Sequence, residues 1–413
     1  MTRLEEMGAL AKQAARKLAV AGSQKDKALE AIADALIAHT QEILAANGED
    51  LDAARANGMS QSLLDRLALN EKRIQGMAQG VRQVAAQPDP VGQVLEGSLR
   101  PNGLRIEKVS VPLGVVGMIY EARPNVTADA AALCLKAGNA VILRGGKEAF
   151  RSNRAIAQVM RQAVESAGLP ADSIQLVEDT SRASSVEMMG LTGYLDVLIP
   201  RGGAGLIRTV VENSRVPVIE TGVGNCHVYV DDAADTDMAV NIIFNAKTSR
   251  PSVCNAIETV LVHKDAAQRV LPAVKAKLDE KQVEIRGCER TCHILSGCTP
   301  ATEEDWSTEY LDYILAVKVV DSLDEAMDHI ARYSSGHSEC IVTENYAHAE
   351  RFLNEVDSAA VYVNASTRFT DGGEFGLGAE VGISTQKLHA RGPMGVRQLT
   401  SQKFIIRGSG QIR

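Results

Sequence analysis

The chain has 413 residues, of which 45% are hydrophobic and 23% are charged, and its formal net charge at pH 7 is −8. This length and composition predict an ordinary globular protein of two or three domains, each with enough apolar residues for a buried core. The negative charge argues against a nucleic-acid partner held by a general basic surface.

No stretch approaches the ~18 uninterrupted apolar residues of a membrane-spanning helix, and the charged segment 1–20 lacks the apolar core of a signal peptide. We therefore expect a cytoplasmic protein that does not bind a membrane. The seven cysteines are an odd number in a chain without a secretory signal, which predicts free thiols rather than a disulfide framework.

A cysteine-rich segment, residues 287–298, contains Cys288, Cys292, His293 and Cys298. Its spacing matches neither a paired zinc motif nor a standard iron–sulfur run. We therefore expect these residues to be loop thiols and predict no metal.

The first part of the chain, residues 1–95, is predicted to be helical. Apolar residues recur at helical spacing in residues 23–44, and Ser23 is suited to cap that helix. In residues 96–113 the period changes to that of strands around Pro-Asn-Gly at 101–103, a turn sequence typical of a β-hairpin. The hairpin belongs to no evident core, so we expect it to dock against another subunit.

From Gly114 onward, strands and helices alternate. The first series of apolar segments lies at 114–120, 139–144, 173–178, 195–200 and 216–220, and the second at 256–263, 314–321, 338–344 and 359–364. Such apolar strands, separated by amphipathic helices, predict parallel sheets covered on both faces. We therefore predict two α/β domains, 114–232 and 233–385, and a tail at 386–413 that supplies a last strand beside the hairpin.

One cysteine follows a polar, proline-containing loop and precedes a predicted strand. Lys247 and Arg250 lie close to Cys254 in the sequence, and nearby cations lower a thiol's pKa from about 8.5 and favour the thiolate. A thiolate attacks carbonyl groups. A buried cysteine that only packs is the alternative, and position alone does not decide between the two.

Polar residues follow the first two strands of the α/β series, where such sheets present side chains to ligands. Arg123 and Asn125 follow the first strand, and Asn125 is either a helix N-cap or an amide donor to a developing oxyanion. Arg144 and Lys147 flank two glycines after the second strand, an arrangement that suits either a phosphate or a solvated turn.

Glycines also follow later strands. Gly202 and Gly203 open a helix, which suits an anion at the helix N-terminus. The pattern G-x-G-x-x-G is absent from the sequence, so a dinucleotide would be bound differently from the usual mononucleotide fold. Glu220 and Gly222 follow the next predicted strand, and Glu220 is either a base or an exposed carboxylate.

A long polar segment follows residue 364 and contains Thr367 and Arg368. Such a segment is uncommon unless it binds a ligand, and Arg368 is suited to clamp a carboxylate if it is not simply a surface arginine. His227 and His389 are weak candidates, because a single histidine is more often structural.

Several long segments together resemble the aldehyde dehydrogenase superfamily, most closely its reductases of L-glutamyl 5-phosphate. They are residues 112–127, 138–148, 198–206, 245–255 and 361–395, in that order. The resemblance covers nearly the whole chain. It implies an aldehyde dehydrogenase-like α/β fold with a cofactor domain that includes the N-terminal helices, a catalytic domain, and an oligomerisation hairpin with a tail strand.

The same resemblance implies NADPH as cofactor, a homo-oligomer, and a glutamate 5-kinase as a partner that supplies the unstable substrate. The activity it implies is reduction of L-glutamyl 5-phosphate to L-glutamate 5-semialdehyde and phosphate through a cysteinyl thioester. A hydrolytic aldehyde dehydrogenase and a non-catalytic relative are the alternatives.

Site roles follow from the resemblance residue by residue. Cys254 matches the nucleophile, and Asn125 matches the amide that forms the oxyanion hole with the Cys254 N–H. Arg144, with Lys147 nearby, matches the position that contacts the adenosine ribose. Gly202 and Gly203 match the turn beneath the pyrophosphate.

The remaining roles are less direct. Glu220 matches the carboxylate that activates water in hydrolytic members, a base that a reductase does not need, so its role stays open. The carboxylate near the nicotinamide ribose aligns near Glu309 or Asp312, and we predict Asp312, with Gly222 also on the cofactor side. The substrate's phosphate and α-carboxylate are assigned to four residues: Arg123, Arg250, Arg368 and Thr367.

Overall fold

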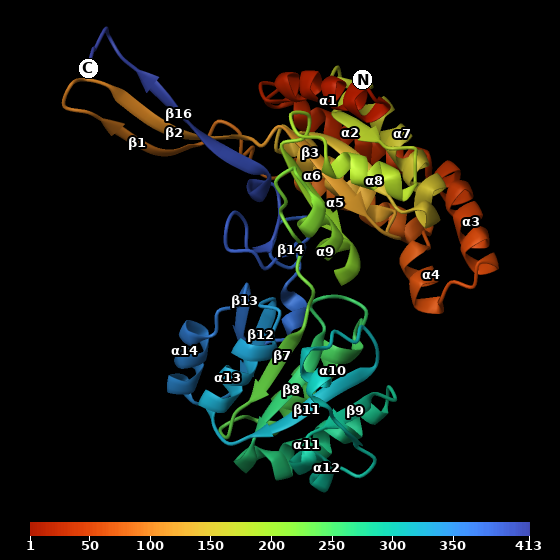
Figure 1. The fold of residues 1–413 in the computed structure, drawn as a ribbon, viewed down its shortest axis with the longest axis vertical. Coiled ribbons are helices and arrows are strands. Elements are labelled where there is room, and N and C mark those ends of the chain that lie inside the picture. The colour runs from red at the N-terminus through yellow and green to blue at the C-terminus, as the bar shows by residue number, and fades with distance from the viewer. The chain divides into compact units, whose positions relative to one another are not determined.

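The computed structural model describes residues 1–61 and 63–413. The chain forms two compact units (Figure 1). Unit 1 consists of Met1–Thr221, Gly376–Gly382 and Met394–Arg413, and unit 2 consists of Gly222–Phe375 and Ile383–Pro393. Within the described part of the chain, none of the helices combines the length and apolar character needed to cross a membrane.

Unit 1 begins with helices, as the sequence predicts. They are α1 (Arg3–Leu18), α2 (Gln24–Ala38), α3 (Thr40–Ala56), α4 (Gln61–Leu67) and α5 (Glu71–Ala85). The segment predicted as one helix, 23–44, is divided at His39, whose backbone (φ −99°, ψ 21°) leaves the helical conformation. Ser23 occupies the N-cap position of α2, but its hydroxyl accepts no capping bond from the described residues.

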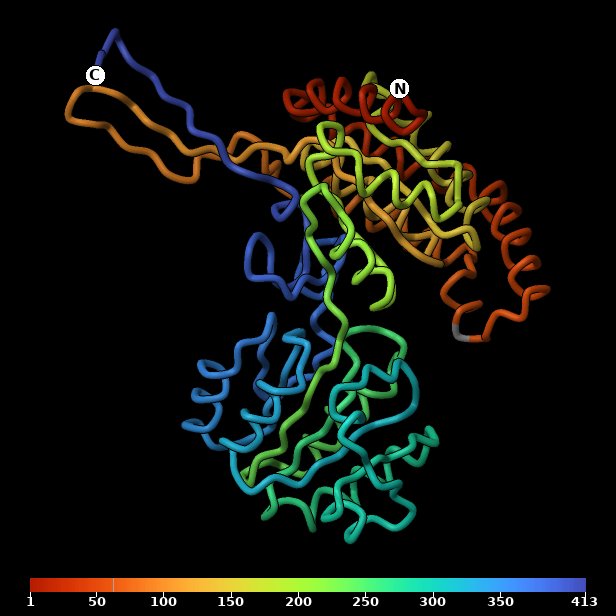
Figure 2. The backbone as a smooth tube through the Cα atoms, viewed as in Figure 1, coloured from red at the N-terminus to blue at the C-terminus, as the bar shows by residue number. Residues whose placement is uncertain are grey.

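A three-stranded antiparallel sheet forms the hairpin and the tail. The strands β1 (Val94–Leu99) and β2 (Arg105–Pro112) are joined by a turn in which Gly103 has φ of 88°. The tail strand β16 (Thr400–Arg407) pairs with β2 along its whole length. These strands project from the rest of unit 1 as a ribbon (Figure 2).

The main sheet of unit 1 is parallel, with the order β5-β4-β3-β6. Its strands are β3 (Val115–Tyr120), β4 (Ala140–Gly145), β5 (Ile174–Leu176) and β6 (Val197–Arg201), and its helices are α6 (Asn125–Lys136), α7 (Phe150–Ser166), α8 (Arg182–Met189) and α9 (Ala204–Asn213). The strand predicted at 216–220 is reduced to a single bridge between Leu198 and Val218.

Unit 2 is built on a parallel seven-stranded sheet with the order β10-β9-β11-β8-β7-β12-β13. Its strands are β7 (Cys226–Val230), β8 (Ile257–His263), β9 (Glu284–Gly287), β10 (Thr299–Pro300), β11 (Ile314–Val320), β12 (Ser338–Val342) and β13 (Ala360–Val363). Its helices are α10 (Thr236–Thr248), α11 (Lys264–Asp279), α12 (Glu289–Ile294), α13 (Leu323–Tyr333) and α14 (Tyr346–Glu355). A short antiparallel pair, β14 (Ile383–Ser384) and β15 (Gly392–Pro393), completes it.

The division between the units differs from the predicted boundaries. β7 pairs with β8 and β12, so it lies inside the sheet of unit 2, whereas the boundary predicted after residue 232 places it in the cofactor domain. The tail predicted at 386–413 is also divided, since the units exchange at Pro393 and Met394. Strand pairing over long sequence distances determines both the placement of β7 and the division of the tail.

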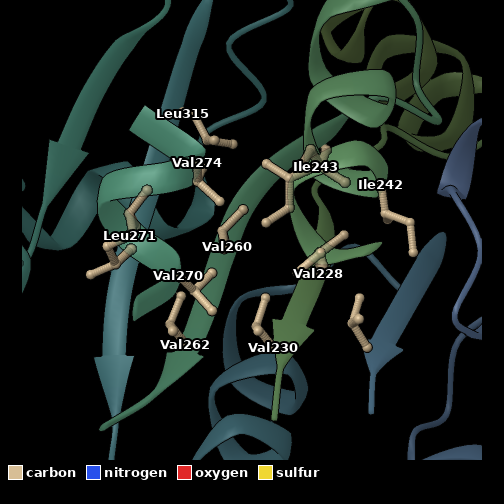
Figure 3. Close-up of a cluster of buried hydrophobic side chains, with 14 of the residues drawn as sticks. Val228, Val230, Ile242, Ile243, Val260, Val262, Val270, Leu271, Val274 and Leu315 are labelled. Atoms are coloured by element: carbon tan, nitrogen blue, oxygen red, sulfur yellow. The ribbon is translucent and has the colours of Figure 1, made fainter. Parts of the chain in front are cut away.

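The core of unit 2 lies on both faces of its sheet. On β8, Val260 and Val262 pack into one cluster together with residues of α10 and α11 (Figure 3). Leu261, between them, points to the opposite cluster, which contains residues of α13 and α14. The run of apolar residues in this strand therefore reflects burial on both sides, as in other parallel sheets.

An ion pair between α10 and β8 is completely buried in unit 2. Lys247 of α10 and Glu258 of β8 are both 0% exposed, and their Nζ and Oε2 atoms lie 2.5 Å apart. Burial raises the pKa of Glu258 to about 7 and lowers the pKa of Lys247. Lys247, which the sequence suggests as a cation for Cys254, is thus turned inward and paired elsewhere.

Replacing Lys247 by methionine leaves the Glu258 carboxylate buried without its partner, and we expect a loss of about 3–5 kcal/mol in unfolding free energy near pH 8. The pKa of Glu258 is higher in the folded than in the unfolded chain, so its ionisation opposes folding as pH rises from about 4.5 upward. Urea unfolding should therefore show a smaller deficit near pH 5. The double variant Lys247→Met/Glu258→Gln should lose this pH dependence; an equal deficit at both pH values contradicts the account.

Candidate active site

Cys254 lies in the turn between α10 and β8 and is half-buried. The backbone of Gly224, just before β7, passes directly beneath this turn. A Cβ atom at Gly224 would lie 1.5 Å from the carbonyl oxygen of Cys254, closer than any non-bonded contact. Only glycine therefore permits the approach of the two segments.

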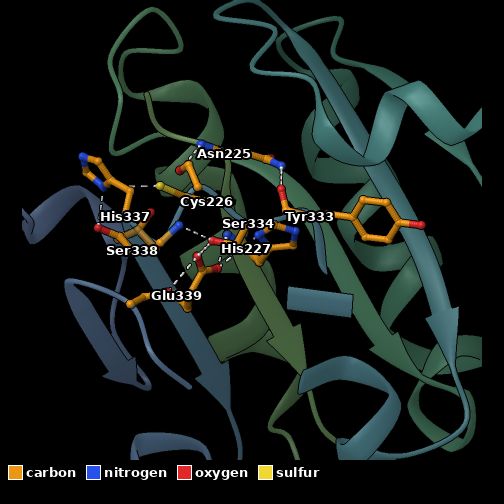
Figure 4. A network of polar contacts seen from close by, with 12 residues as sticks. Asn225, Cys226, His227, Tyr333, Ser334, His337, Ser338 and Glu339 are labelled. Carbon is orange, nitrogen blue, oxygen red and sulfur yellow. Dashed lines mark hydrogen bonds and ion pairs between the residues drawn. The ribbon is translucent and has the colours of Figure 1, made fainter. Parts of the chain in front are cut away.

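A buried polar network supports the turn from below (Figure 4). The Sγ of Cys226 donates to the carbonyl oxygen of Cys254 at 3.1 Å. Burial raises the pKa of Cys226 well above its usual value, so it stays a thiol and keeps its proton for this bond. His337 Nδ1 lies 3.6 Å from the Cys226 sulfur and 2.8 Å from the Ser338 hydroxyl, which contacts the Thr370 hydroxyl at 2.7 Å.

The residue after the cysteine ties the turn to the segment after β13. Asn255 Nδ2 donates to the carbonyl oxygen of Thr370 at 2.9 Å, and the Arg368 guanidinium donates to Asn255 Oδ1 and, at 3.1 Å, to the Ser249 hydroxyl. The hydroxyl of Thr367 is buried and donates to the carbonyl oxygen of Asn255 at 2.7 Å. Thr367, predicted to hold substrate, therefore supports the turn instead.

Cations gather beside the thiol. Burial lowers the pKa of Arg368, Asp371 raises it, the neighbouring Arg250 lowers it, and a Cys254 thiolate raises it. An arginine stays protonated despite such effects, so Arg368 presents a fixed positive charge near Cys254. Arg368 thus supplies the neighbouring cation that the sequence suggests in Lys247.

Glu309 and Asp312, the two candidates for the carboxylate near the nicotinamide ribose, differ in position. Glu309 Oε1 accepts a hydrogen bond from the N–H of Gly224 at 2.7 Å, so it lies beside the segment that supports Cys254. Asp312 is exposed, and its Oδ1 accepts the N–H of Tyr313 at 2.8 Å. Gly222 donates its N–H to the carbonyl oxygen of Ile383 at 2.9 Å.

In unit 1, Asn125 is the first residue of α6. The N-cap position belongs to Pro124, so the N-cap interpretation of Asn125 is wrong. The side chain is exposed, and its Nδ2 donates to Asp129 Oδ2 at 2.9 Å, one turn along the helix. This contact orients the Asn125 side-chain amide, whose NH₂ group has a second N–H that can donate to another acceptor. Arg123 lies in the turn between β3 and α6 and is half-buried.

The two cations after β4 are not equivalent. Arg144 Nη2 donates to the carbonyl oxygens of Thr180 and Ser181 at 2.7 and 2.8 Å, and burial lowers its pKa. Arg144 therefore organises the loop before α8. Lys147 is exposed at the end of the same strand and extends into solvent.

The glycine turn before α9 donates a backbone N–H to an anion. The N–H of Gly203, at the N-cap position of α9, donates to Glu121 Oε2 at 2.9 Å. A Cβ atom at Gly202 would lie 2.6 Å from the same oxygen. Glu220 lies just after the isolated bridge and is half-buried.

The two histidine candidates differ in burial. His227 is fully buried in β7, and His389 is exposed in the loop between β14 and β15. Among the described residues, one group is close enough to share a metal ion, consisting of Asp231, Asp232 and His348. Asp231 already contacts His348 at 2.7 Å and also accepts the hydroxyls of Tyr229 and Thr343, so we assign this group to the packing of unit 2.

Sequence reasoning missed three supporting residues. Asp129 could be found from its spacing to Asn125, since side chains four residues apart on a helix are neighbours. Glu121 and Cys226 gave no signal, because each acts on a segment far away in the sequence.

Comparison with known proteins places the chain. Residues 3–293 match the aldehyde dehydrogenase family. The gamma-glutamyl phosphate reductase of Moorella thermoacetica is 63% identical over 411 residues, 99% of this chain and 98% of the relative, and that of Heliobacterium modesticaldum is 61% identical over 413 residues, 100% and 99%. The crystal structure of the gamma-glutamyl phosphate reductase from Thermotoga maritima has a TM-score of 0.96 at 51% identity and covers 100% of both chains.

An acetylating aldehyde dehydrogenase from Geobacillus thermoglucosidasius, at 20% identity, covers 99% of this chain and 97% of that one with a TM-score of 0.72 and so shares the fold. The chain therefore belongs to the aldehyde dehydrogenase family, and the predicted fold class is confirmed. Within that family it belongs with the gamma-glutamyl phosphate reductases.

Replacing Gly224 by alanine should displace the Cys254 turn, because the added methyl overlaps the Cys254 carbonyl. A displacement of about 1 Å at a reacting group lowers the rate by ~10², so we expect a loss of at least that size in kcat. Gly80→Ala, where the added Cβ atom meets nothing within 4 Å, is the matched control and should keep wild-type kcat. Wild-type kcat for Gly224→Ala in a folded protein contradicts the account.

Proposed function

We propose that the chain catalyses the NADPH-dependent reduction of L-glutamyl 5-phosphate to L-glutamate 5-semialdehyde and phosphate, in proline biosynthesis, through a thioester on Cys254. Full-length identity to gamma-glutamyl phosphate reductases supports the substrate. One observation carries the mechanism: Cys254 is half-buried in a turn that hydrogen bonds hold in place, in the same segment as Arg250 and beside Arg368. A fixed cation favours the thiolate, which is the nucleophilic form.

The first step is acyl transfer to the enzyme. The Cys254 sulfur attacks the γ-carbonyl carbon, a C–S bond forms, and the carbonyl oxygen becomes an oxyanion. The proposed donors to this oxyanion are the Asn125 amide and the Cys254 backbone N–H, and one such donor contributes about 10²–10³ in rate. The C–O bond to phosphate then breaks. Phosphate is a good leaving group, so positioning and the exclusion of water are the enzyme's main tasks.

The substrate carries two further anionic groups, a phosphate and an α-carboxylate. We assign the phosphate to Arg250 and Arg368, because Arg368 interacts electrostatically with both Arg250 and Cys254. Arg123 stays the candidate for the α-carboxylate. Thr367 is not assigned to substrate, since its buried hydroxyl already donates within the protein.

Membership of the family implies a nicotinamide cofactor. The Gly203 N–H donates to the Glu121 carboxylate, and an anionic group of the cofactor would take the place of that carboxylate when it binds. Lys147 offers an exposed charge for a ribose phosphate. Arg144 organises the neighbouring loop. As the carboxylate near the nicotinamide ribose we assign Glu309 rather than Asp312, because Glu309 lies beside the Cys254 turn. When bound, the cofactor supplies the hydride that reduces the thioester.

The chain's residues act again during reduction. The same donors, Asn125 and the Cys254 N–H, stabilise the second oxyanion at the former carbonyl carbon. The C–S bond then breaks, which releases the aldehyde and restores the Cys254 thiolate. This step needs no base to activate water, so the proposal gives Glu220 no catalytic role.

We also propose that the chain forms a homo-oligomer through the sheet of β1, β2 and β16. Large apolar side chains on this sheet are exposed, and they are Val94, Leu95, Leu99, Phe404 and Ile406. An exposed apolar strand ribbon is a pairing surface that proteins normally cover. Because acyl phosphates hydrolyse readily, we propose that a glutamate 5-kinase supplies the substrate nearby.

The function is tested by the reverse reaction. Oxidation of L-glutamate 5-semialdehyde with NADP⁺ should require inorganic phosphate, because phosphate must release the acyl group from Cys254. We expect no sustained cofactor reduction without phosphate and a rate that rises with its concentration. Sustained phosphate-independent production of glutamate would instead identify a hydrolytic aldehyde dehydrogenase in which Glu220 activates water.

Reversing the charge at Lys147 tests the assignment of NADPH. Lys147→Glu should raise the KM for NADPH by ~10-fold or more and leave the KM for NADH nearly unchanged, since a phosphate contact to a cation contributes about 1.5–3 kcal/mol. Steady-state kinetics with both cofactors measure the ratio. Lys72→Glu, an exposed lysine on α5, is the matched control. Equal effects of Lys147→Glu on both cofactors remove Lys147 from the phosphate site.

A further inference from the structure

Two cysteines of unit 2 lie in contact far along the chain from Cys254. Cys292 is on α12, and Cys298 is in the segment that connects α12 to β10. Gly297, with φ of 75°, lies in the turn before Cys298. The two sulfur atoms are 2.7 Å apart, while a disulfide bond is about 2.05 Å long, so a small shift of the side chains suffices to join them.

The surroundings leave room for this pair. A Cβ atom at Gly287, the last residue of β9, would lie 2.5 Å from the Cys298 sulfur, so the absence of a side chain there makes space for it. The Cys292 thiol donates to the carbonyl oxygen of Gly287 at 3.4 Å. Both cysteines are half-buried, so small oxidants in solution reach them.

The other cysteines do not share these properties. Cys134, Cys226 and Cys340 are buried, and burial raises the pKa of each thiol, so they are poor nucleophiles. Cys288 is half-buried, but its sulfur contacts the Thr291 hydroxyl at 3.3 Å and the Val319 N–H at 3.4 Å. Cys254 is also half-buried, but it belongs to the active-site turn. Cys292 and Cys298 differ from the other cysteines because their sulfur atoms contact one another at 2.7 Å.

We propose that Cys292 and Cys298 form a reversible redox site that a peroxide oxidises to a disulfide. Cys292 loses its proton, and the thiolate attacks one oxygen of the peroxide. The O–O bond breaks, a sulfenic acid forms on Cys292, and the hydroxide that leaves takes up the proton to give water. The sulfur of Cys298 then attacks the Cys292 sulfur, an S–S bond forms, and a second water leaves. In total the two thiols lose two protons and two electrons, and hydrogen peroxide becomes two waters.

The order of the two steps follows from the environment. Burial, together with the neighbouring Cys292, raises the pKa of Cys298 to about 12, so Cys298 keeps its proton. We therefore assign the first attack to Cys292. Cys298 is the weaker nucleophile, but it resolves the sulfenic acid because its sulfur lies 2.7 Å from that of Cys292. A dithiol reductant reverses the reaction by thiol–disulfide exchange.

The disulfide would tie together one edge of the sheet in unit 2. β10 is the edge strand, and it pairs with β9 through Thr299 with Arg286 and Pro300 with Gly287. A bond between Cys292 and Cys298 links α12 to the start of this strand. Oxidation should thus restrict local opening of β10, a short strand held on one side only.

The tryptic peptides make the test specific. Residues 291–318 form one tryptic peptide that contains Cys292 and Cys298 and no other cysteine, and residues 287–290 form another that contains only Cys288. The full-length protein is treated with hydrogen peroxide, alkylated with N-ethylmaleimide and digested. We expect the 291–318 peptide to lose both alkylation sites and two hydrogens, and to regain both sites after dithiothreitol, while the Cys288 peptide stays alkylated.

Variants separate the two roles. Cys298→Ser should stop disulfide formation and leave a Cys292 sulfenic acid that dimedone traps, with basal reductase activity retained. Cys292→Ser should give neither the disulfide nor a dimedone adduct on that peptide. The proposal is overturned if both thiols remain alkylatable when Cys288 is already oxidised, or if Cys292 pairs with Cys288 instead.

Discussion

The close approach of the Gly224 backbone to the Cys254 carbonyl is the contact on which the catalytic unit depends. It requires β7 and β8 to be neighbours in the sheet, and it requires a residue without a Cβ atom just before β7. The N–H of Gly224 donates to the Glu309 carboxylate, and the thiol of Cys226, the first residue of β7, donates to the Cys254 carbonyl oxygen. The position of Cys254 thus depends on the pairing of β7 with β8 as well as on the hydrogen bonds of its own turn.

Burial assigns different roles to residues of the same type. Cys226 is fully buried and stays protonated, so it acts as a hydrogen-bond donor, whereas Cys254, in the turn above it, is half-buried and is the nucleophile that we propose. The same distinction separates two cations. Lys247 is buried against Glu258, while Arg368 keeps part of its guanidinium accessible beside the thiol. In each pair the buried residue, Cys226 or Lys247, supports the fold. For the other residue, Cys254 or Arg368, we propose a role in the reaction.

The sequence predicted what depends on local pattern. The apolar strands of unit 2 and the nucleophile candidate Cys254 could be located because their signals lie within short segments. The position of β7 could not, because its partners β8 and β12 are distant in the sequence. Lys247 was misjudged for a related reason, since closeness in sequence to Cys254 says nothing about which way a helix residue points. Asn125 was open between two roles, and its position as the first residue of α6, after Pro124 at the N-cap, decided against the N-cap.

The covalent role of Cys254 is the central claim, and trapping the acyl-enzyme tests it most directly. The protein is mixed with L-glutamyl 5-phosphate, freshly generated by a glutamate kinase, in the absence of a nicotinamide cofactor, then quenched in acid and digested for mass spectrometry. The account predicts a glutamyl adduct on the peptide that contains Cys254, with release of phosphate in proportion, and no adduct in Cys254→Ser. Phosphate release without an adduct, or full reductase turnover by Cys254→Ser, would contradict it.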